Sequence, residues 1–257
     1  MLQAVGNGAF GEVRKAEELT THHYVAVKDF KVKWDDETAY RRCKNELENH
    51  ALVEHPSVVA LYGHFFMKGI DESSFHVYII LELCSGGSIE SVRSQKQPPK
   101  HHFSENETKK YCVDILEALV HMHELKIMHR DIKPANILIA DNGRPKIADF
   151  GFSVKSSSRR RSVLGTWNYM APEIVDKNDY SEKVDCWSFG IMVYILLVGE
   201  KPYNSEERKL TSVPPLLFPD SLSVDARDFT EQFLMIDPEK RMSFKEALSH
   251  RWIQKKK

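Results

Sequence analysis

A dense group of polar residues lies between two apolar runs in the stretch MHRDIKPANILIADN, residues 128–142. Within it, Asp131 can accept a proton from a hydroxyl group, and Lys133 can neutralise a phosphate. The amide oxygen of Asn136 can bind a metal ion. These residue types at this spacing therefore predict one site that handles a hydroxyl, a phosphate and a metal ion together.

A second candidate metal ligand is Asp149, which apolar residues flank in the stretch IADFGFS. A hard cation such as Mg²⁺ prefers oxygen ligands and usually keeps waters and substrate phosphates in its coordination shell. Two protein ligands are then enough. We therefore expect Asp149 and Asn136 to supply the protein's share of a magnesium site.

Glycines at three positions, Gly6, Gly8 and Gly11, precede Val13 in the stretch GNGAFGEV. Such glycines let backbone N–H groups approach phosphate oxygens, although an ordinary hairpin turn is the simpler interpretation. A dinucleotide-binding fingerprint requires a helix directly after the glycines. Here the strand-like YVAVKDF follows instead. The sequence therefore predicts a strand–turn–strand unit.

Lys28 lies in that expected strand, and Glu46 lies in the helix expected after it. A lysine on a strand usually points into solvent, which is the simpler interpretation of Lys28. Glu46, however, shares a helix face with Cys43 and His50, so its carboxylate can point inward. An inward ion pair would hold the Lys28 amine where it reaches two phosphates.

The elements that must position these residues change in character along the chain. Residues 1–83 read mostly as strands with one helix, and the paired glycines within 84–88 predict a hinge. Helical periods dominate residues 89–257, where Ser104 and Glu107 form an expected capping box. The expected strands cover 24–32, 57–66 and 75–83, and the expected helices cover 37–53, 105–125, 186–199, 225–236 and 243–253.

Composition narrows the function classes. A chain of 257 residues can form two lobes, and its formal net charge of −1 disfavours a nucleic-acid or membrane-surface binder. The 4 cysteines lack metal or disulfide spacing, which favours an intracellular location, in the cytoplasm, the nucleus or both. The sequence contains neither a membrane-spanning apolar run nor the pattern of a signal peptide at its start.

Taken in order, these motifs resemble the catalytic domain of eukaryotic protein kinases. The matching pieces are the glycine-rich loop, VAVK, a helix glutamate, HRDIKPAN, DFG, GTWNYMAPE, DCWSFG and the arginine of DPEKR. The resemblance covers almost the whole chain. It implies a bilobal α+β fold, with a small five-stranded antiparallel lobe carrying one regulatory helix (1–83), a hinge (84–88) and a larger, mainly helical lobe (89–257).

The resemblance also implies phosphoryl transfer from ATP to protein hydroxyls, with Mg²⁺ or Mn²⁺. Asp131 would orient the acceptor hydroxyl, and Lys133 would hold the phosphate beside it. Lys28, fixed by Glu46, would bind the α- and β-phosphates. The remaining expected nucleotide and metal contacts are Gly6, Gly8, Gly11, Val13, Ala26, Leu81 as gatekeeper, the backbone of Glu82 and Cys84, Leu138, Asn136 and Asp149.

Two structural features follow from the same match. Glu173 and Arg241 would form a buried ion pair that braces the large lobe, and loss of one partner would cost on the order of 3–5 kcal/mol. His50 stands where the family packs an apolar side chain between the lobes, so we expect a buried, neutral histidine.

The branch and subfamily follow from finer details. Lys133 and Thr166 resemble the serine/threonine branch. LYGHFF, DFGFSV and the arginine-rich run resemble Aurora-type kinases, while LVGEKPY also resembles polo-like and calmodulin-dependent kinases, and GTWNYMAPE resembles the NEK type. A pseudokinase scaffold and a nucleotide-binding oxidoreductase are alternatives from other classes. The complete set of phosphate- and metal-handling residues disfavours the first, and the strand after the glycines disfavours the second.

Regulation is predicted in KSSSRRRSVLGT, where Ser162 stands three residues before Gly165. The resemblance places an activating phosphate on Ser162, paired with Arg130, although a solvated loop is the alternative interpretation. In the cyclic-AMP-dependent kinase and its relatives, three acidic residues bind the arginines of the substrate. The matching residues here are Ser88, Ala135 and Ile195. Because none of these residues is acidic, we expect a separate activating kinase upstream. We also expect protein substrates and a monomeric domain.

Overall fold

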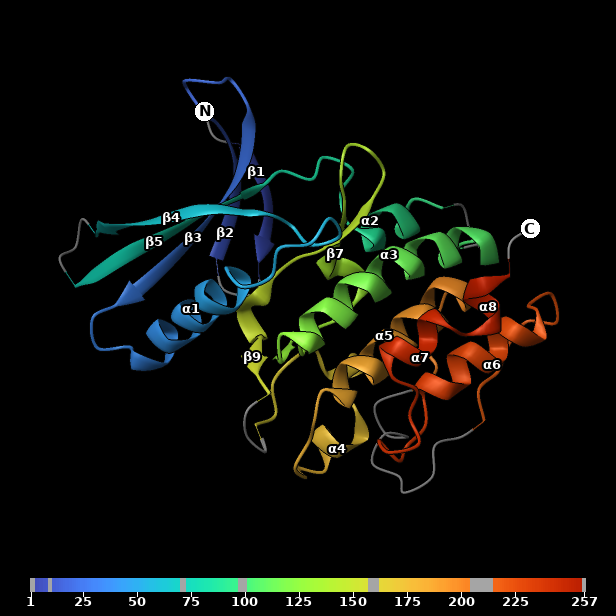
Figure 1. The fold of residues 1–257 in the computed structure, drawn as a ribbon. Helices are drawn as coiled ribbons and strands as arrows, with labels where there is room; N and C mark the ends of the chain where they lie inside the picture. Colours follow the sequence, from blue (N-terminus) through green and yellow to red (C-terminus); the bar gives the residue numbers. More distant parts are fainter. Residues whose placement is uncertain are drawn as a thin grey trace.

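The chain folds into two lobes of different secondary structure in a computed structural model (Figure 1). The described residues are 3–8, 11–69, 73–96, 101–156, 162–203 and 215–255. The N-terminal lobe is a five-stranded antiparallel sheet in the order β1-β2-β3-β5-β4, with one helix, α1. These elements are β1 (Gln3–Gly8), β2 (Gly11–Glu17), β3 (Tyr24–Lys33), α1 (Glu37–His50), β4 (Leu61–Lys68) and β5 (Ser74–Glu82). The expected small five-stranded lobe is confirmed.

The glycines of this segment lie at the facing ends of β1 and β2, which pair with Gly8 opposite Gly11. A strand therefore follows the glycines, and the oxidoreductase arrangement is excluded. Gly11 also lies directly against β3, because a Cβ atom built there would come within 2.1 Å of the Asp29 carbonyl oxygen. Any larger residue would push β2 away from β3.

Strand β3 places Lys28 on the inner face of the sheet. Its buried positions alternate, at Ala26, Lys28, Phe30 and Val32, as the two-residue period of a strand requires. Phe30 and Val32 pack into an apolar cluster with Cys43 of α1. Lys28 therefore points toward α1, and the simpler interpretation of a solvated strand lysine is wrong.

Helix α1 begins after the N-cap Asp36, whose side chain accepts a hydrogen bond from Ala39 N–H. It ends at His50, three residues before the predicted end. The reason is that Leu52 and Val53 donate to Asn49 and His50 in tight turns, which break the α-helical pattern. Val53 then packs into the core of the C-terminal lobe.

Strand β4 starts at Leu61, later than the predicted residue 57. Val59 N–H donates to the Ile147 carbonyl over 2.9 Å, and Ile147 N–H donates to the Ser57 carbonyl over 2.9 Å. Residues 57–59 therefore pair with a strand of the other lobe and connect the two lobes.

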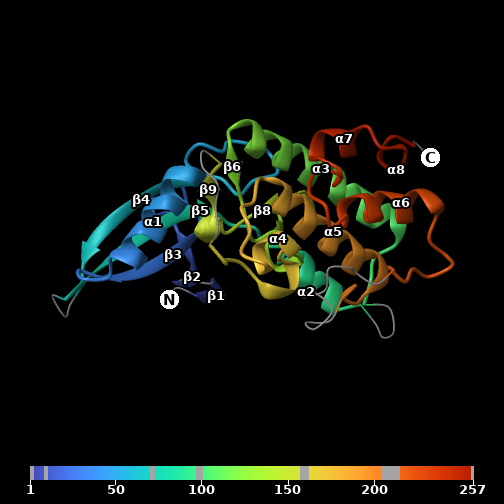
Figure 2. The same cartoon turned by 90° about the horizontal axis from the view of Figure 1, so that it is seen from below.

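The C-terminal lobe is mainly helical, as expected, and α5 is buried along almost its whole length. Figure 2 shows α5 among α3, α4 and α6. The capping box of Ser104 and Glu107 at the start of α3 is confirmed. The elements are α2 (Ile89–Ser94), α3 (Glu105–Glu124), β6 (Ile127–Met128), η1 (Pro134–Asn136), β7 (Ile137–Ile139), β8 (Pro145–Ile147), η2 (Phe150–Phe152), β9 (Val154–Lys155), η3 (Trp167–Tyr169), α4 (Pro172–Val175), α5 (Lys183–Val198), α6 (Val224–Phe233), α7 (Phe244–Leu248) and α8 (Arg251–Gln254).

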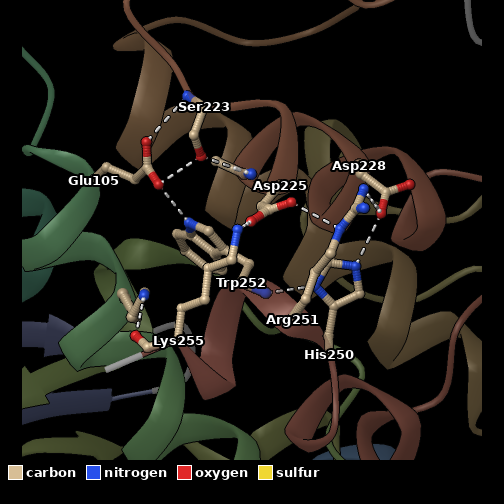
Figure 3. A network of polar contacts seen from close by, with 10 residues as sticks. Glu105, Ser223, Asp225, Asp228, His250, Arg251, Trp252 and Lys255 are labelled. Atoms are coloured by element: carbon tan, nitrogen blue, oxygen red, sulfur yellow. Dashed lines mark hydrogen bonds and ion pairs between the residues drawn. The ribbon is translucent and has the colours of Figure 1, made fainter. Parts of the chain in front are cut away.

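The predicted helix 243–253 is two helices, because the chain is extended at His250 between α7 and α8. The His250 side chain accepts a hydrogen bond from Trp252 N–H and so caps α8. Figure 3 shows how polar contacts then tie α8 to its neighbours. Trp252 Nε1 donates to Glu105 of α3 over 2.8 Å, and Arg251 Nε lies 2.7 Å from Asp225 of α6.

A buried ion pair joins Glu173 of α4 to Arg241 before α7. The two guanidinium nitrogens of Arg241 lie 2.7 and 3.0 Å from the two carboxylate oxygens of Glu173. Arg241 also donates to the Lys183 carbonyl at the start of α5. The pair expected from the resemblance is thus brought together.

Within the described residues, no helix combines the length and apolar character needed to cross a bilayer.

His50 lies between the lobes and is 3% exposed. Its Nε2–H donates to the Val59 carbonyl over 2.7 Å, and its ring stacks on Phe150 at 4.3 Å between ring centroids. Phe150 in turn meets the ring of His129 edge-on at 5.4 Å. Burial lowers the pKa of His50 from 6.5 to about 4, so the side chain is neutral near pH 7.

This pKa predicts a pH-dependent stability that disappears in His50→Leu. As the pH falls from 6.5 to 4, the unfolded chain binds a proton at this residue and the folded chain does not. The free energy of unfolding should therefore fall by up to about 1.4 kcal/mol per pH unit in that window and be unaffected by His50 above it. Urea unfolding at pH 7.5 and at pH 4.5 measures the difference.

The exposed residue His23 provides a matched control, and His23→Leu should keep the acid slope of the wild type. Equal acid slopes for wild type and His50→Leu would contradict the assignment of a buried, neutral His50.

Candidate active site

A cavity of about 370 Å³ lies between the two lobes. Its apolar walls come from both lobes, with Val13, Ala26 and Leu81 on the sheet and Leu138 on β7. Two such walls can enclose a flat aromatic ring. Other expected residues that line the cavity are Lys28, Glu46, Glu82, Cys84, Asn136 and Asp149.

Glu82 and Cys84, where the chain passes from one lobe to the other, also line this cavity. Glu82 N–H donates to the Ala60 carbonyl over 2.9 Å, so of its two backbone groups only the carbonyl can serve a bound base. Glu82 is itself held by an ion pair with Lys146 at 2.8 Å. Burial raises the pKa of the Cys84 thiol to about 12, which makes that side chain a neutral part of the wall and not a nucleophile.

Three charged side chains meet at the inner end of the cavity. Lys28 Nζ lies 2.6 Å from Glu46 Oε1 and 2.8 Å from Asp149 Oδ1. Burial alone would lower the pKa of Lys28, but the two carboxylates raise it, so the amine stays cationic. Burial would likewise raise the pKa of Asp149, but Lys28 lowers it, so the Asp149 carboxylate is ionised at neutral pH.

The residues expected to hold a metal ion fit that task. The Asn136 amide nitrogen donates to the Asp131 carbonyl and to Asp131 Oδ2, both over 2.9 Å. Both bonds use the nitrogen, so the amide oxygen points away from Asp131 and is the potential metal ligand. Asp149 and Asn136 both line the cavity. No cluster of three or more His, Cys, Asp or Glu side chains suited to a metal exists in the described part of the chain. The site therefore suits an ion that takes its other ligands from water and phosphate.

Asp131 is almost fully buried, and its carboxylate is held from several sides. Lys133 Nζ donates to Asp131 Oδ2 and to Thr166 Oγ1, both over 2.7 Å. Thr166 Oγ1–H donates to Asp131 Oδ1 over 2.7 Å. A hydroxyl group therefore already occupies a position from which it can give a proton to this carboxylate. Asp131, Lys133 and Asn136 of one loop are thus brought together with Thr166 of a second segment.

The loop that carries Asp131 is anchored by Asp185, a residue that was not among those predicted from the sequence. The Asp185 carboxylate is fully buried and accepts from His129 N–H at 2.8 Å and Arg130 N–H at 2.7 Å. Burial alone would raise the pKa of Asp185, but the hydrogen bond from His123 and the nearby His129 ring lower it. The sequence signal that could have indicated Asp185 is its charge at the start of a largely apolar helix.

Arg130 connects the loop to two further segments. Its backbone is left-handed, at φ +65°, a costly conformation for a residue with a Cβ. Its side chain donates to the Phe152 carbonyl over 2.7 Å and to Ser162 Oγ over 3.1 Å. The expected neighbours Arg130 and Ser162 are thus in contact, while residues 157–161 of the intervening loop lie outside the described part of the chain.

Three residues match the acids that bind substrate arginines in the cyclic-AMP-dependent kinase, and these three lie in different surroundings. Ser88 caps α2 in a reciprocal pair with Ser91. Ala135 lines the interlobe cavity, whereas Ile195 is 3% exposed within the core of the C-terminal lobe. None of these three residues offers a charge to a bound peptide.

Comparisons with known proteins agree with this geometry. Residues 1–253 match the family model described as protein kinase domain. An Aurora/IPL1-related protein kinase 2 of Caenorhabditis elegans is 34% identical over 97% of this chain and 81% of its own length. Aurora kinases of Schizosaccharomyces pombe and Patiria pectinifera are each 36% identical over 98% of this chain, and over 70% and 61% of their own lengths.

These relatives favour the Aurora type over the polo-like, NEK and calmodulin-dependent alternatives and over a scaffold without activity. Protein kinases use ATP and a divalent metal ion and act on proteins. The chain belongs to the protein kinase family, and it is an Aurora-like serine/threonine protein kinase.

Proposed function

We propose that the chain transfers the γ-phosphoryl group of ATP to serine and threonine hydroxyls of proteins, with Asp131 as the proton acceptor. The contact that carries this proposal is the 2.7 Å hydrogen bond from the Thr166 hydroxyl to Asp131. It marks a place where an acceptor hydroxyl fits beside a fixed carboxylate. Lys133, 2.7 Å from the same carboxylate, would neutralise the phosphate next to it.

The nucleotide would bind in the interlobe cavity. Lys28 would hold the α- and β-phosphates, and Glu46 fixes the Lys28 amine by an ion pair in which both side chains are almost fully buried. Asn136 and Asp149 would hold Mg²⁺, which when bound neutralises charge on the phosphate oxygens. The backbone of Gly6 and Gly8 in β1 and of Gly11 in β2 would cover the phosphates.

Asp131→Asn removes the proton acceptor and keeps the shape of the side chain. We expect its turnover to fall by a factor of about 10²–10⁴ in an assay with ATP, Mg²⁺ and a generic protein substrate. The turnover of Lys28→Met should fall to background in the same assay. Thermal unfolding should show that both variants remain folded.

The matched control is Asp220→Asn, an identical change at an exposed position, which should retain wild-type turnover. Near-normal turnover by pure, folded Asp131→Asn would refute the role of Asp131.

We also propose that phosphorylation of Ser162 switches the kinase on. Ser162 is exposed to solvent, so another kinase can reach it, yet its hydroxyl already lies 3.1 Å from Arg130. A phosphate there would add about two negative charges and strengthen the contact. Because Arg130 also holds the Phe152 carbonyl, a tighter contact would steady the segment that carries Asp149.

Ser162→Ala should therefore lack activation. The unmodified and the phosphorylated wild-type forms are to be compared, with the site of modification assigned by mass spectrometry. We expect the phosphorylated form to be on the order of tenfold more active, and Ser162→Ala to stay at the unmodified level after the same treatment. Active protein from its native cell without phosphate on Ser162 would contradict the switch.

We further propose that the activating kinase is a separate enzyme, because Ser88, Ala135 and Ile195 offer no carboxylate for the arginines before Ser162. A peptide array tests this choice. Arginine two or three residues before the acceptor should raise phosphorylation by less than about threefold, since exposed charge pairs contribute little. Strong selection for arginine there would overturn the proposal.

An intracellular location remains our proposal. It is supported by the cysteines, because all 4 are buried, free thiols, as a reducing compartment allows.

A further inference from the structure

A buried hydroxyl that the reaction does not use points at Ser162. Tyr180, just before α5, is 7% exposed and packs in an apolar cluster with Met170 and Trp187. Its hydroxyl lies 2.9 Å from Arg130 NH1 and 3.0 Å from Ser162 Oγ, and it donates to the Ser162 carbonyl over 3.1 Å. Ser162 therefore lies against two groups of the C-terminal lobe, one cationic and one neutral.

We propose that Tyr180 is a second anchor for the phosphate on Ser162, beside Arg130. The inference rests on the proposed phosphorylation of Ser162 and extends it. In that reaction Ser162 Oγ loses its proton and takes the γ-phosphoryl group of ATP, and ADP leaves. The modified side chain then carries only acceptor oxygens, so the single Tyr180 O–H turns from the Ser162 carbonyl and donates to the phosphate.

The two anchors differ in what they hold. The ring of Tyr180 is fixed in the apolar cluster, so its hydroxyl has a defined position in the large lobe. Arg130 is fixed at its backbone by Asp185 and reaches the Phe152 carbonyl with its Nε. A phosphate bound by both would connect the large lobe to the segment next to Asp149. Tyr180 is thus a positioning residue for the metal ligand.

Close packing around Gly165 keeps this arrangement in place. Gly165 has φ +118°, and a Cβ atom there would come within 2.6 Å of the Arg130 carbonyl oxygen. The chain leaving Ser162 therefore passes directly over the backbone of Arg130. Gly165 therefore keeps the chain three residues after Ser162 close to the catalytic loop.

Tyr180→Phe in the full chain tests the proposal, because it removes the hydroxyl and keeps the ring. The ratio of kcat/KM between the Ser162-phosphorylated and unmodified forms should fall severalfold below the wild-type ratio and stay above one, because one hydrogen bond to the phosphate is lost while Arg130 remains. The ³¹P resonance of the phosphoserine supplies a second readout. Its second pKa, ordinarily about 6, should be higher in Tyr180→Phe than in wild type, since a donor to the dianion is lost.

Tyr194→Phe is the matched control, because Tyr194 is equally buried and donates its hydroxyl to the Leu217 carbonyl. It should keep the wild-type activation ratio and ³¹P titration. Thermal unfolding of both variants separates loss of the contact from loss of the fold.

The outcomes are distinct. A wild type that phosphorylation fails to activate would refute the switch, and the ³¹P titration would still decide the Tyr180 contact. A wild type that is activated, with the same ratio and the same ³¹P titration in Tyr180→Phe, would overturn the role of Tyr180 alone.

Discussion

The hydrogen bonds of one buried carboxylate, Asp185, hold the catalytic loop in place. Its oxygens take the backbone N–H groups of His129 and Arg130, and this contact offsets the left-handed backbone of Arg130. Asp185 lies in the first turn of α5, which is buried along almost its whole length, so the loop is attached to the centre of the large lobe. Asp131 directly follows Arg130 in the chain, so its position is fixed by the same contacts.

A second set of contacts joins the lobes across the cavity. Lys28 of the sheet contacts Glu46 of α1 and Asp149 of the large lobe, so one cation bridges three segments. Beside it, His50 stacks on Phe150 and adds an apolar contact between α1 and the same segment. Arg130 reaches that segment from the other side through Phe152. The proposed phosphate-binding Lys28, the proposed metal ligand Asp149 and the Arg130–Ser162 contact therefore all meet at one short stretch of chain.

The sequence was a good guide to elements and a poor guide to where they end. The helix beginning at residue 37 was expected, but its last turn tightens and Val53 joins the other lobe. Residues 57–60 look like strand, yet 57–59 pair with Ile147 across the lobes. The segment 243–253 is split where His250 caps a new helix. In each case a contact with a distant segment outweighed the local pattern.

The sequence by itself determined the residue types of the site and their local order, because phosphoryl transfer needs an acid–base carboxylate, a cation and oxygen ligands at short spacing. Asp131, Lys133, Asn136 and Asp149 could be named for that reason. Only the tertiary structure decided that Asp149 joins the expected Lys28–Glu46 pair, that Asp185 holds Arg130, and that the Tyr180 hydroxyl meets Ser162. These contacts join residues far apart in the chain, and local propensity carries no information about which distant side chains share a buried space.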